Sequence, residues 1–366
     1  MKYRILPLLL CLILLASCGA KPEPTSSPTP EPTPTPVVTF TPTPEPTPEP
    51  TPGGPTNPLT GLPMSEEYVG KRPLAVMLSN IAEAQPQQGV GQADMIYEVL
   101  AEGGITRMVA LFQEYGDMAL TGSVRSTRPY YLDIAQGHDA ILFHAGGSTD
   151  AYLQIKNRGV TALDCVNGPY EGTLFWRDAT RRANNGFVHS VVTSGAKITE
   201  YFPKYSFRME HEEGYVPTLT FVEDATPKGE VATTLEVRFS GYKTAFFTYV
   251  EESKLYLASQ SLNGRTEKPY TDGNTKEQQG FTNVLVLFAD GKVLDNEGRL
   301  SVDLVGSGEG YFICGGRYIA IKWEKESFAS PFVYTTKSGE ALSLGMGRSY
   351  VCVLSSTGGP TVTFRS

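Results

Sequence analysis

The sequence is short of charge, cysteine and histidine, and each shortage narrows the class of protein. Only 19% of the 366 residues are charged, and the formal net charge is −8 at pH 7. Nucleic-acid-binding proteins need a basic surface that neutralises phosphates, so this acidic balance argues against that class. The five cysteines and four histidines include no CxxC and no Cys/His ligand spacing, and we therefore predict neither a metal site nor a cofactor. A hydrophobic content of 40% excludes bulk disorder.

Long apolar runs are also absent, apart from one near the N-terminus. Lys2 and Arg4 precede the uncharged residues 5–16, a run too short to cross a hydrocarbon core of ~30 Å as a helix. The run leads into Leu15-Ala16-Ser17-Cys18, which resembles the lipobox of bacterial lipoproteins. We predict a lipoprotein signal peptide over residues 1–17 and a diacylglycerol- and palmitate-type anchor at Cys18. An ordinary secretory signal with a chance cysteine is the alternative.

Residues 18–56 combine the predicted anchor with a Pro/Thr/Glu-rich stalk. Between Pro22 and Pro58 there are 15 prolines, which favour an extended polyproline II chain. At ~3.1 Å per residue such a stalk reaches roughly 100 Å. It is similar to the wall-spanning spacers of Gram-positive surface proteins, and a ligand for SH3-type modules is the rival interpretation. We therefore expect a lipid-anchored protein on the extracytoplasmic face of a Gram-positive cell membrane, with a cell-wall polymer or an envelope protein as partner and no nucleic acid.

Residues 57–225 alternate strand and helix signals. Strands are expected at 74–78, 94–101, 105–112 and 139–144, with Glu102-Gly103-Gly104 forming the turn of a hairpin. Helices are expected from Ser126 to Gln136, from about Ser148 to Asn157, and between Ser194 and Phe202. This order indicates an α/β (or α+β) N-terminal domain.

Residues 226–366 read as a mostly antiparallel β C-terminal domain. Short strand-like runs are separated by turn pairs such as Asn263-Gly264 and Asp290-Gly291. Cys314 and Cys352 lie in neighbouring runs and could form a disulfide. With Cys165 the number of cysteines beyond the anchor is odd, so the usual alternative is a set of small buried apolar side chains.

Arg125 and Arg128 stand three residues apart at a predicted helix start. Free N–H groups, the helix dipole and two guanidinium groups favour an anion there, such as a carboxylate or a phosphate. The alternative is neutralisation within the protein by acidic residues (Asp94, Glu98, Glu102 or Asp133).

The stretch His144-Ala-Gly-Gly-Ser148 lies at a predicted strand-to-helix junction. Glycine amides can approach a ligand closely, and Ser148 or Thr149 can cap the helix. His144 is then either a ligand contact or proton carrier, or a buried histidine bonded to a carbonyl.

Glu98 and Glu102 are four residues apart and could divide acid and base roles, as in glycosidases. Ion pairs with Arg107 or with the arginines at 125 and 128 are the structural alternative. A polar and aromatic stretch, residues 176–178 and 184–189, could line a saccharide or peptide groove, or form only a loop. Cys165 with His144 or His189 could form a nucleophile pair, although no spacing requires it.

Several stretches resemble the YerB-like lipoproteins, a bacterial family with domains of unknown function. The matching residues are Asn57-Pro-Leu-Thr-Gly-Leu62, Ala75-Val-Met-Leu-Ser-Asn80, Gln92-Ala-Asp-Met-Ile-Tyr-Glu98, Ala101-Glu-Gly-Gly-Ile-Thr-Arg107, Val124-Arg-Ser-Thr-Arg-Pro129 and His144-Ala-Gly-Gly-Ser148. The C-terminal likeness is looser, around Asn283-Val-Leu-Val286 and Val305-Gly-Ser-Gly308. The family's Gly-Lys…Gly-x-Trp-x-Lys pattern is only partly kept, as Gly316-Arg317 and Lys322-Trp323-Glu324-Lys325. The resemblance implies a two-domain envelope lipoprotein and no particular activity.

Three functional hypotheses follow. The first is a membrane-tethered protein that binds an anionic envelope polymer, peptidoglycan or teichoic acid, through candidate residues Asn80, Arg107, Arg125, Arg128, His144, Ser148 and His189. The second is a cell-wall hydrolase or lyase with Glu98 or Glu102 as acid or base. The third is an adaptor for envelope protein assembly, in which the arginines are structural.

Overall fold

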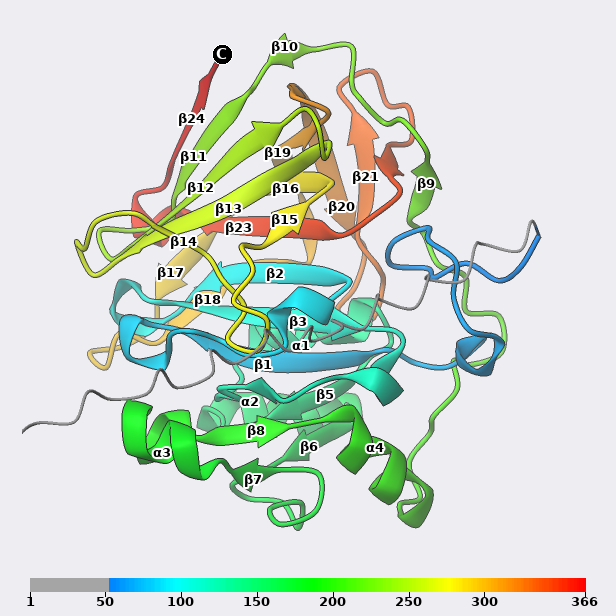
Figure 1. Cartoon of the computed structure of the whole chain (residues 1–366), viewed down its shortest axis with the longest axis vertical. Helices are drawn as coiled ribbons and strands as arrows, with labels where there is room; N and C mark the ends of the chain where they lie inside the picture. Colours follow the sequence, from blue (N-terminus) through cyan, green and yellow to red (C-terminus); the bar gives the residue numbers. More distant parts are fainter. Residues whose placement is uncertain (1–52) are drawn as a thin grey trace, which may run out of the picture. The chain divides into compact units, whose positions relative to one another are not determined.

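The computed structural model describes residues 53–366 (Figure 1). The predicted signal peptide, Cys18 and the stalk up to residue 52 lie outside the described residues. Within residues 53–366, no helix is both long and apolar enough to cross a membrane.

An 11-stranded sheet runs through the molecule in the order β10-β20-β19-β16-β23-β2-β3-β1-β5-β6, with β21 paired to β20. Residues before 225 supply one end of it: β1 (Leu74–Asn80), β2 (Met95–Leu100), β3 (Thr106–Phe112), β5 (Ile141–His144) and β6 (Ala162–Asp164). Later residues supply the other: β10 (Glu230–Val231), β16 (Asn283–Ala289), β19 (Gly306–Cys314), β20 (Arg317–Lys325), β21 (Val333–Thr336) and β23 (Ser349–Ser355). The two ends meet where β2 and β23 pair in parallel, from Met95 with Ser349 to Val99 with Val353.

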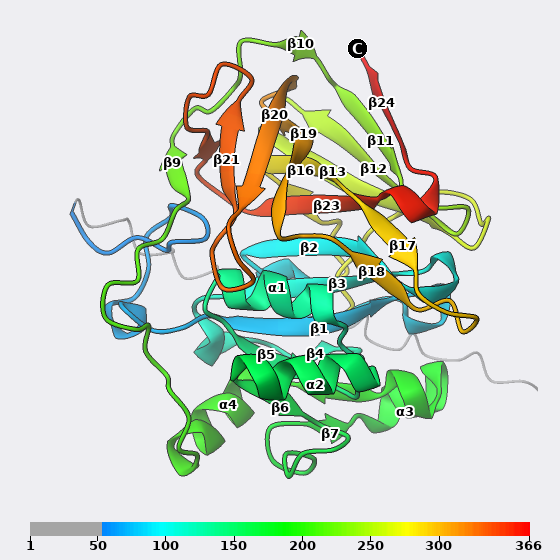
Figure 2. The same ribbon diagram turned by 180° about the vertical axis from the view of Figure 1, so that it is seen from behind.

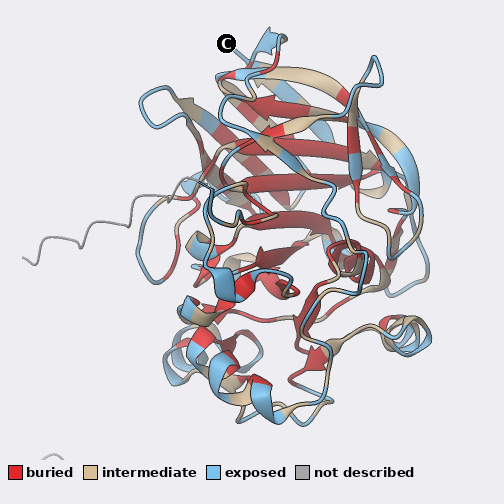
Figure 3. Ribbon diagram, turned by 90° about the vertical axis from the view of Figure 1, so that its right-hand side faces the viewer, coloured by how far each residue is buried: buried red, intermediate tan, exposed pale blue. Residues whose placement is uncertain are grey.

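The central strands are apolar on both faces because both faces are covered. Every residue of β1, β2, β3 and β23 is buried, and the strands through the middle of the molecule stand out as buried in Figure 3. Helices α1 (Pro129–Gly137) and α2 (Thr149–Arg158) cover one face (Figure 2). Continuous apolar runs are typical of strands buried in this way.

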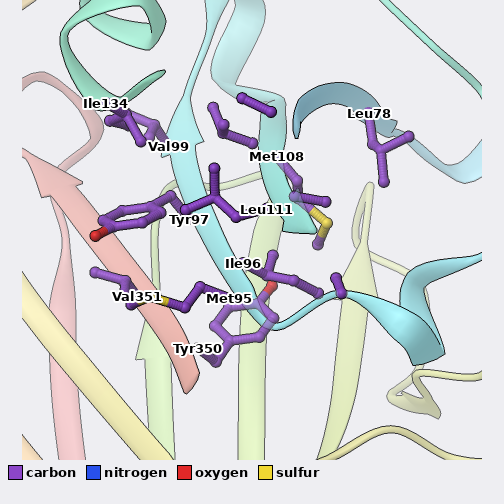
Figure 4. Close-up of a cluster of buried hydrophobic side chains, with 14 of the residues drawn as sticks. Leu78, Met95, Ile96, Tyr97, Val99, Met108, Leu111, Ile134, Tyr350 and Val351 are labelled. Atoms are coloured by element: carbon purple, nitrogen blue, oxygen red, sulfur yellow. The ribbon is translucent and has the colours of Figure 1, made fainter. Parts of the chain in front are cut away.

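A six-stranded sheet covers the other face, in the order β14-β13-β12-β11-β24, with β15 paired to β13. Its strands are β11 (Thr234–Arg238), β12 (Lys243–Val250), β13 (Leu255–Leu262), β14 (Lys268–Pro269), β15 (Gly280–Phe281) and β24 (Thr361–Arg365). Alternate residues of β13 are buried, as expected for a strand with one face on the core. Tyr350 of β23, beside Met95 and Ile96 in Figure 4, packs edge-on against Phe247 and Phe281 of this sheet.

Smaller elements complete the fold. They are α3 (Ala179–Asn185), α4 (Gly195–Tyr201), the sheet of β4 (Thr121–Gly122), β8 (Val191–Thr193) and β7 (Trp176–Arg177), and the pairs β17 (Gly291–Val293) with β18 (Leu300–Val302) and β9 (Thr220–Val222) with β22 (Ser343–Gly345).

The predicted fold class is confirmed: an N-terminal half with helices and strands precedes a half built of largely antiparallel strands. The expected hairpin is β2 and β3, paired antiparallel. Helix α1 begins at Pro129 rather than at Ser126, because Arg128 has an extended backbone and proline occupies the first helical position. Cys165, Cys314 and Cys352 are all buried with free thiols, so the possible disulfide between the last two is not formed.

A buried ion pair joins the two sheets. Lys243 Nζ on β12 lies 3.2 Å from the Glu98 carboxylate on β2, and both side chains are essentially inaccessible to solvent. Asn80, Thr106 and Tyr350 donate further hydrogen bonds to this carboxylate. Burial lowers the pKa of Lys243, and the nearby Glu98 charge opposes that effect. Each charge in this core therefore depends on the other for its neutralisation.

Replacing Lys243 with Met should destabilise the protein strongly. The change leaves the Glu98 carboxylate buried without its cation, so the free energy of unfolding should fall by about 3–5 kcal/mol. Denaturant unfolding measures this loss, with Lys292→Ala on exposed β17 as the neutral control. A loss below about 1 kcal/mol, the size of an ordinary surface effect, would show that the pair is not required.

The buried His138 should make the stability of the protein depend on pH. Its imidazole Nε2 lies 2.9 Å from the Tyr97 hydroxyl, and burial lowers its pKa to about 3, with Lys325 and His211 adding to the shift. The unfolded chain binds this proton near pH 6.5 and the folded protein does not. This residue's contribution to stability is therefore complete above pH 6.5 and declines by up to about 1.4 kcal/mol per pH unit down to pH 3. In His138→Gln, the measured free energy of unfolding should vary less with pH between these values. Equal pH dependence in the variant and the natural protein would show that His138 is not responsible.

Candidate functional site

Four arginines, which we call the arginine cluster, converge at one side of the N-terminal half: Arg107 of β3, Arg125 after β4, Arg128 before α1 and Arg177 of β7. The segment that carries Arg125 is fixed by its backbone, which donates to the Met77 carbonyl of β1 and accepts from Ala145. Burial lowers the pKa of Arg125, and the charges of the other three arginines lower it further. Crowded cations of this kind are unfavourable unless anions balance them.

Carboxylates balance only part of this charge. Glu102 pairs with Arg128 through two hydrogen bonds, and Glu171 lies 3.0 Å from Arg177. Burial would raise the pKa of Glu102, but its bonds and ion pairs with Arg128 and Arg107 lower it below its usual value. The cluster therefore keeps an excess of positive charge.

Arg107 and Arg125 carry that excess. Arg107 Nη1 is buried, 3.8 Å from Glu102, and has no hydrogen-bond partner within residues 53–366. Arg125 donates 2.9 Å to the Val188 carbonyl and has no ion pair with any described carboxylate. A buried guanidinium N–H without an acceptor, as in Arg107, is costly, and the partly exposed Arg125 beside it is suited to receive an external anion.

An aromatic loop borders the cluster. Phe187 and Val188 are exposed, and the Arg177 guanidinium stacks 3.8 Å above the Phe187 ring. His189 is buried, its Nδ1 has no partner within the described chain, and burial and the Arg125 charge lower its pKa. The polar and aromatic stretch singled out in the sequence thus lies beside the arginines.

His144, Ser148 and Asn80 have structural contacts instead. The His144 imidazole is buried and bonds to the Gly146 carbonyl at 2.9 Å, and burial lowers its pKa. Ser148 caps α2 by accepting from the Ala151 N–H. Asn80 points to the buried Glu98. These contacts favour the structural interpretation of all three residues.

The two candidate catalytic carboxylates do not share a site. Glu98 is fully enclosed and pairs with Lys243, whereas Glu102 follows β2 and pairs with Arg128. An acid or base must reach the proton that it transfers, which an enclosed carboxylate cannot do. The expected pairing of Glu98 with Arg107 is absent. Lys243 pairs with Glu98 instead. The sequence could have indicated this, because Lys243 occupies an inward-facing position of a strand whose residues alternate between buried and partly exposed.

The other chemical possibilities gain no support from the geometry. Burial raises the pKa of the Cys165 thiol to about 12, so it carries no nucleophilic thiolate near neutral pH. Nowhere in residues 53–366 do three His, Cys, Asp or Glu side chains gather as a metal site requires.

Comparison with known proteins places the chain in a family. Residues 59–208 match "Protein of unknown function (DUF3048) N-terminal domain" and residues 235–351 match the corresponding C-terminal domain. The chain is 29% identical over 299 residues to "Putative lipoprotein YerB" of Bacillus subtilis, covering 81% of this chain and 85% of the relative. It also resembles the crystal structure of YerB protein from Bacillus subtilis, with a TM-score of 0.70, 25% identity, and coverage of 84% of this chain and 99% of the other. The chain therefore belongs to the YerB-like family and combines a DUF3048 N-terminal domain with a DUF3048 C-terminal domain.

Proposed function

We propose that this protein is a membrane-tethered extracytoplasmic lipoprotein whose arginine cluster binds an anionic group of a cell-envelope polymer, peptidoglycan carboxylate or teichoic acid phosphate. The observation that carries the proposal is the unbalanced charge of Arg107 and Arg125. Arg107 offers a buried N–H without an acceptor, and Arg125 has no carboxylate partner among the described residues.

Several features of the cluster favour a carboxylate or phosphate over other ligands. Guanidinium groups bind both anions through paired hydrogen bonds, and these charge-assisted bonds are stronger than neutral ones. The cluster also adjoins the start of α1, where the helix dipole favours negative charge. The exposed Phe187 offers an apolar surface to the rest of the ligand.

The location rests on other observations. The predicted lipobox at Cys18 and the proline-rich stalk would hold the folded part away from the membrane, and the name of the Bacillus subtilis relative agrees with a lipid anchor. A wall polymer is the abundant polyanion within reach of such a stalk in a Gram-positive envelope. The hydrolase alternative is weaker, because Glu98 is enclosed and Glu102 is paired with Arg128.

A simple anion should bind the cluster and stabilise the folded protein. Inorganic phosphate at ten times its dissociation constant should raise the free energy of unfolding by about 1.4 kcal/mol relative to chloride of equal ionic strength. Arg125→Ala should abolish this difference, because it removes the cation without a carboxylate partner. Arg365→Ala, an exposed arginine of β24, is the matched control. Equal phosphate effects in both variants would place the anion elsewhere.

Binding to cell walls tests the polymer itself. The full chain in detergent should sediment with purified Gram-positive walls, and Arg125→Ala should weaken this binding about tenfold, the effect of losing one charge-assisted contact. Walls stripped of teichoic acid distinguish the two anions, and Arg365→Ala should bind normally.

Two results would overturn this proposal. Release of soluble muropeptides by the purified protein would establish hydrolysis or lysis in place of simple binding. Absence of both binding and release would favour the adaptor hypothesis, in which a protein is the partner.

A further inference from the structure

A separate pocket of about 380 Å³ lies between the loop after β1 and the segment that joins β13 to β14. Gln85 and Gln260 contribute to its lining, and none of the arginines of the cluster does. Its volume lies in the range of ordinary small-molecule sites. Neither domain description nor the name of the relative assigns a ligand to it.

The buried ion pair fixes how Gln260 faces this pocket. Lys243 Nζ, which can only donate, lies 2.6 Å from Gln260 Oε1. The amide oxygen of Gln260 is thus held inward, and its Nε2 amino group has no partner among residues 53–366. The pocket therefore contains a free hydrogen-bond donor.

Glu98 fixes Gln85 in the opposite sense. Its carboxylate only accepts, so Asn80 must present Nδ2 to it and Oδ1 to Gln85. Gln85 Nε2 donates to that Oδ1 at 3.0 Å, which leaves Gln85 Oε1 as an acceptor without a partner in the described chain. The pocket thus offers one donor and one acceptor whose orientations are set from the core.

Charges and apolar groups surround this pair. Arg265 and Lys268 are exposed cations of the pocket lining, and Arg265 lies 3.9 Å from Glu83 on the facing loop. Apolar contacts come from Ala82, Pro86, Leu262 and Pro269. None of the ten described lining residues is aromatic, so the pocket lacks the ring on which a sugar would stack.

We propose that this pocket is a second binding site, for a short peptide-like ligand that carries a carboxylate. A secondary amide supplies one C=O to Gln260 Nε2 and one N–H to Gln85 Oε1. The carboxylate pairs with Arg265 and Lys268 in place of Glu83, and the apolar residues contact small side chains. The site is independent of the anion bound by the arginine cluster.

The dipeptide N-acetyl-Ala-Glu is a suitable probe, titrated calorimetrically into the full chain in detergent. Saturable binding is expected, weakened about tenfold in Arg265→Ala/Lys268→Ala, because the carboxylate loses its partners. Glu83→Gln should tighten binding severalfold, since it removes the carboxylate that competes for Arg265. These three residues are exposed, so their variants should fold.

The controls separate this site from others. Lys292→Ala/Arg365→Ala removes two exposed cations elsewhere and should bind the dipeptide normally, as should Arg125→Ala. N-methylacetamide and acetate, each with half of the proposed chemistry, should bind at least about tenfold more weakly. Absence of saturable binding, undiminished binding by Arg265→Ala/Lys268→Ala, or equal binding of N-acetylglucosamine would each overturn the proposal.

Discussion

The buried pair of Glu98 and Lys243 is the constraint on which the rest of the structure depends. Desolvating two charges costs several kcal/mol per ion, and only close pairing with further hydrogen bonds repays it. Here the pair lies between β2 of the large sheet and β12 of the six-stranded sheet, with donors from β1, β3 and β23. Apolar packing tolerates small displacements, whereas this arrangement does not. The pair therefore specifies how one sheet lies on the other, in addition to the apolar area they bury.

The same reasoning separates structural charge from charge that is available to a ligand. Glu98 and Lys243 neutralise each other within the core, and the outermost amides, Gln85 and Gln260, are oriented from within. Around Arg125 the balance fails: cations outnumber carboxylates, and an N–H of Arg107 is buried without an acceptor. Buried polar and charged groups in protein cores normally have partners. An excess of positive charge at a half-buried position therefore favours a ligand-binding role for these arginines over a purely structural one.

Local sequence patterns predicted the helices and strands well, but they predicted poorly which strands and side chains distant in the sequence pair with each other. The β2–β3 hairpin and the Ser148 cap follow from turn and capping chemistry within a few residues, whereas the predicted start of α1 at Ser126 lies three residues too early. The partner of Glu98 depends instead on how two sheets stack, which no local pattern encodes: Lys243 pairs with it, and not one of the arginines considered as alternatives. Likewise, the parallel pairing of β2 with β23 brings residues 95–99 beside 349–353, so the two halves share a sheet that composition alone does not reveal.

Strand β1 relates the two candidate sites to each other. The Met77 carbonyl holds the backbone of Arg125, and Asn80 holds the Gln85 amide at the pocket, so groups three residues apart on one strand support both. Met77 and Asn80 are fully buried, and interiors packed this closely permit little relative movement. The separation of the two sites is therefore set by the sheet. A wall polymer that carries both an anionic group and a peptide would gain from engaging both only if its own spacing matched that separation, because effective concentration vanishes when a linker cannot span the sites.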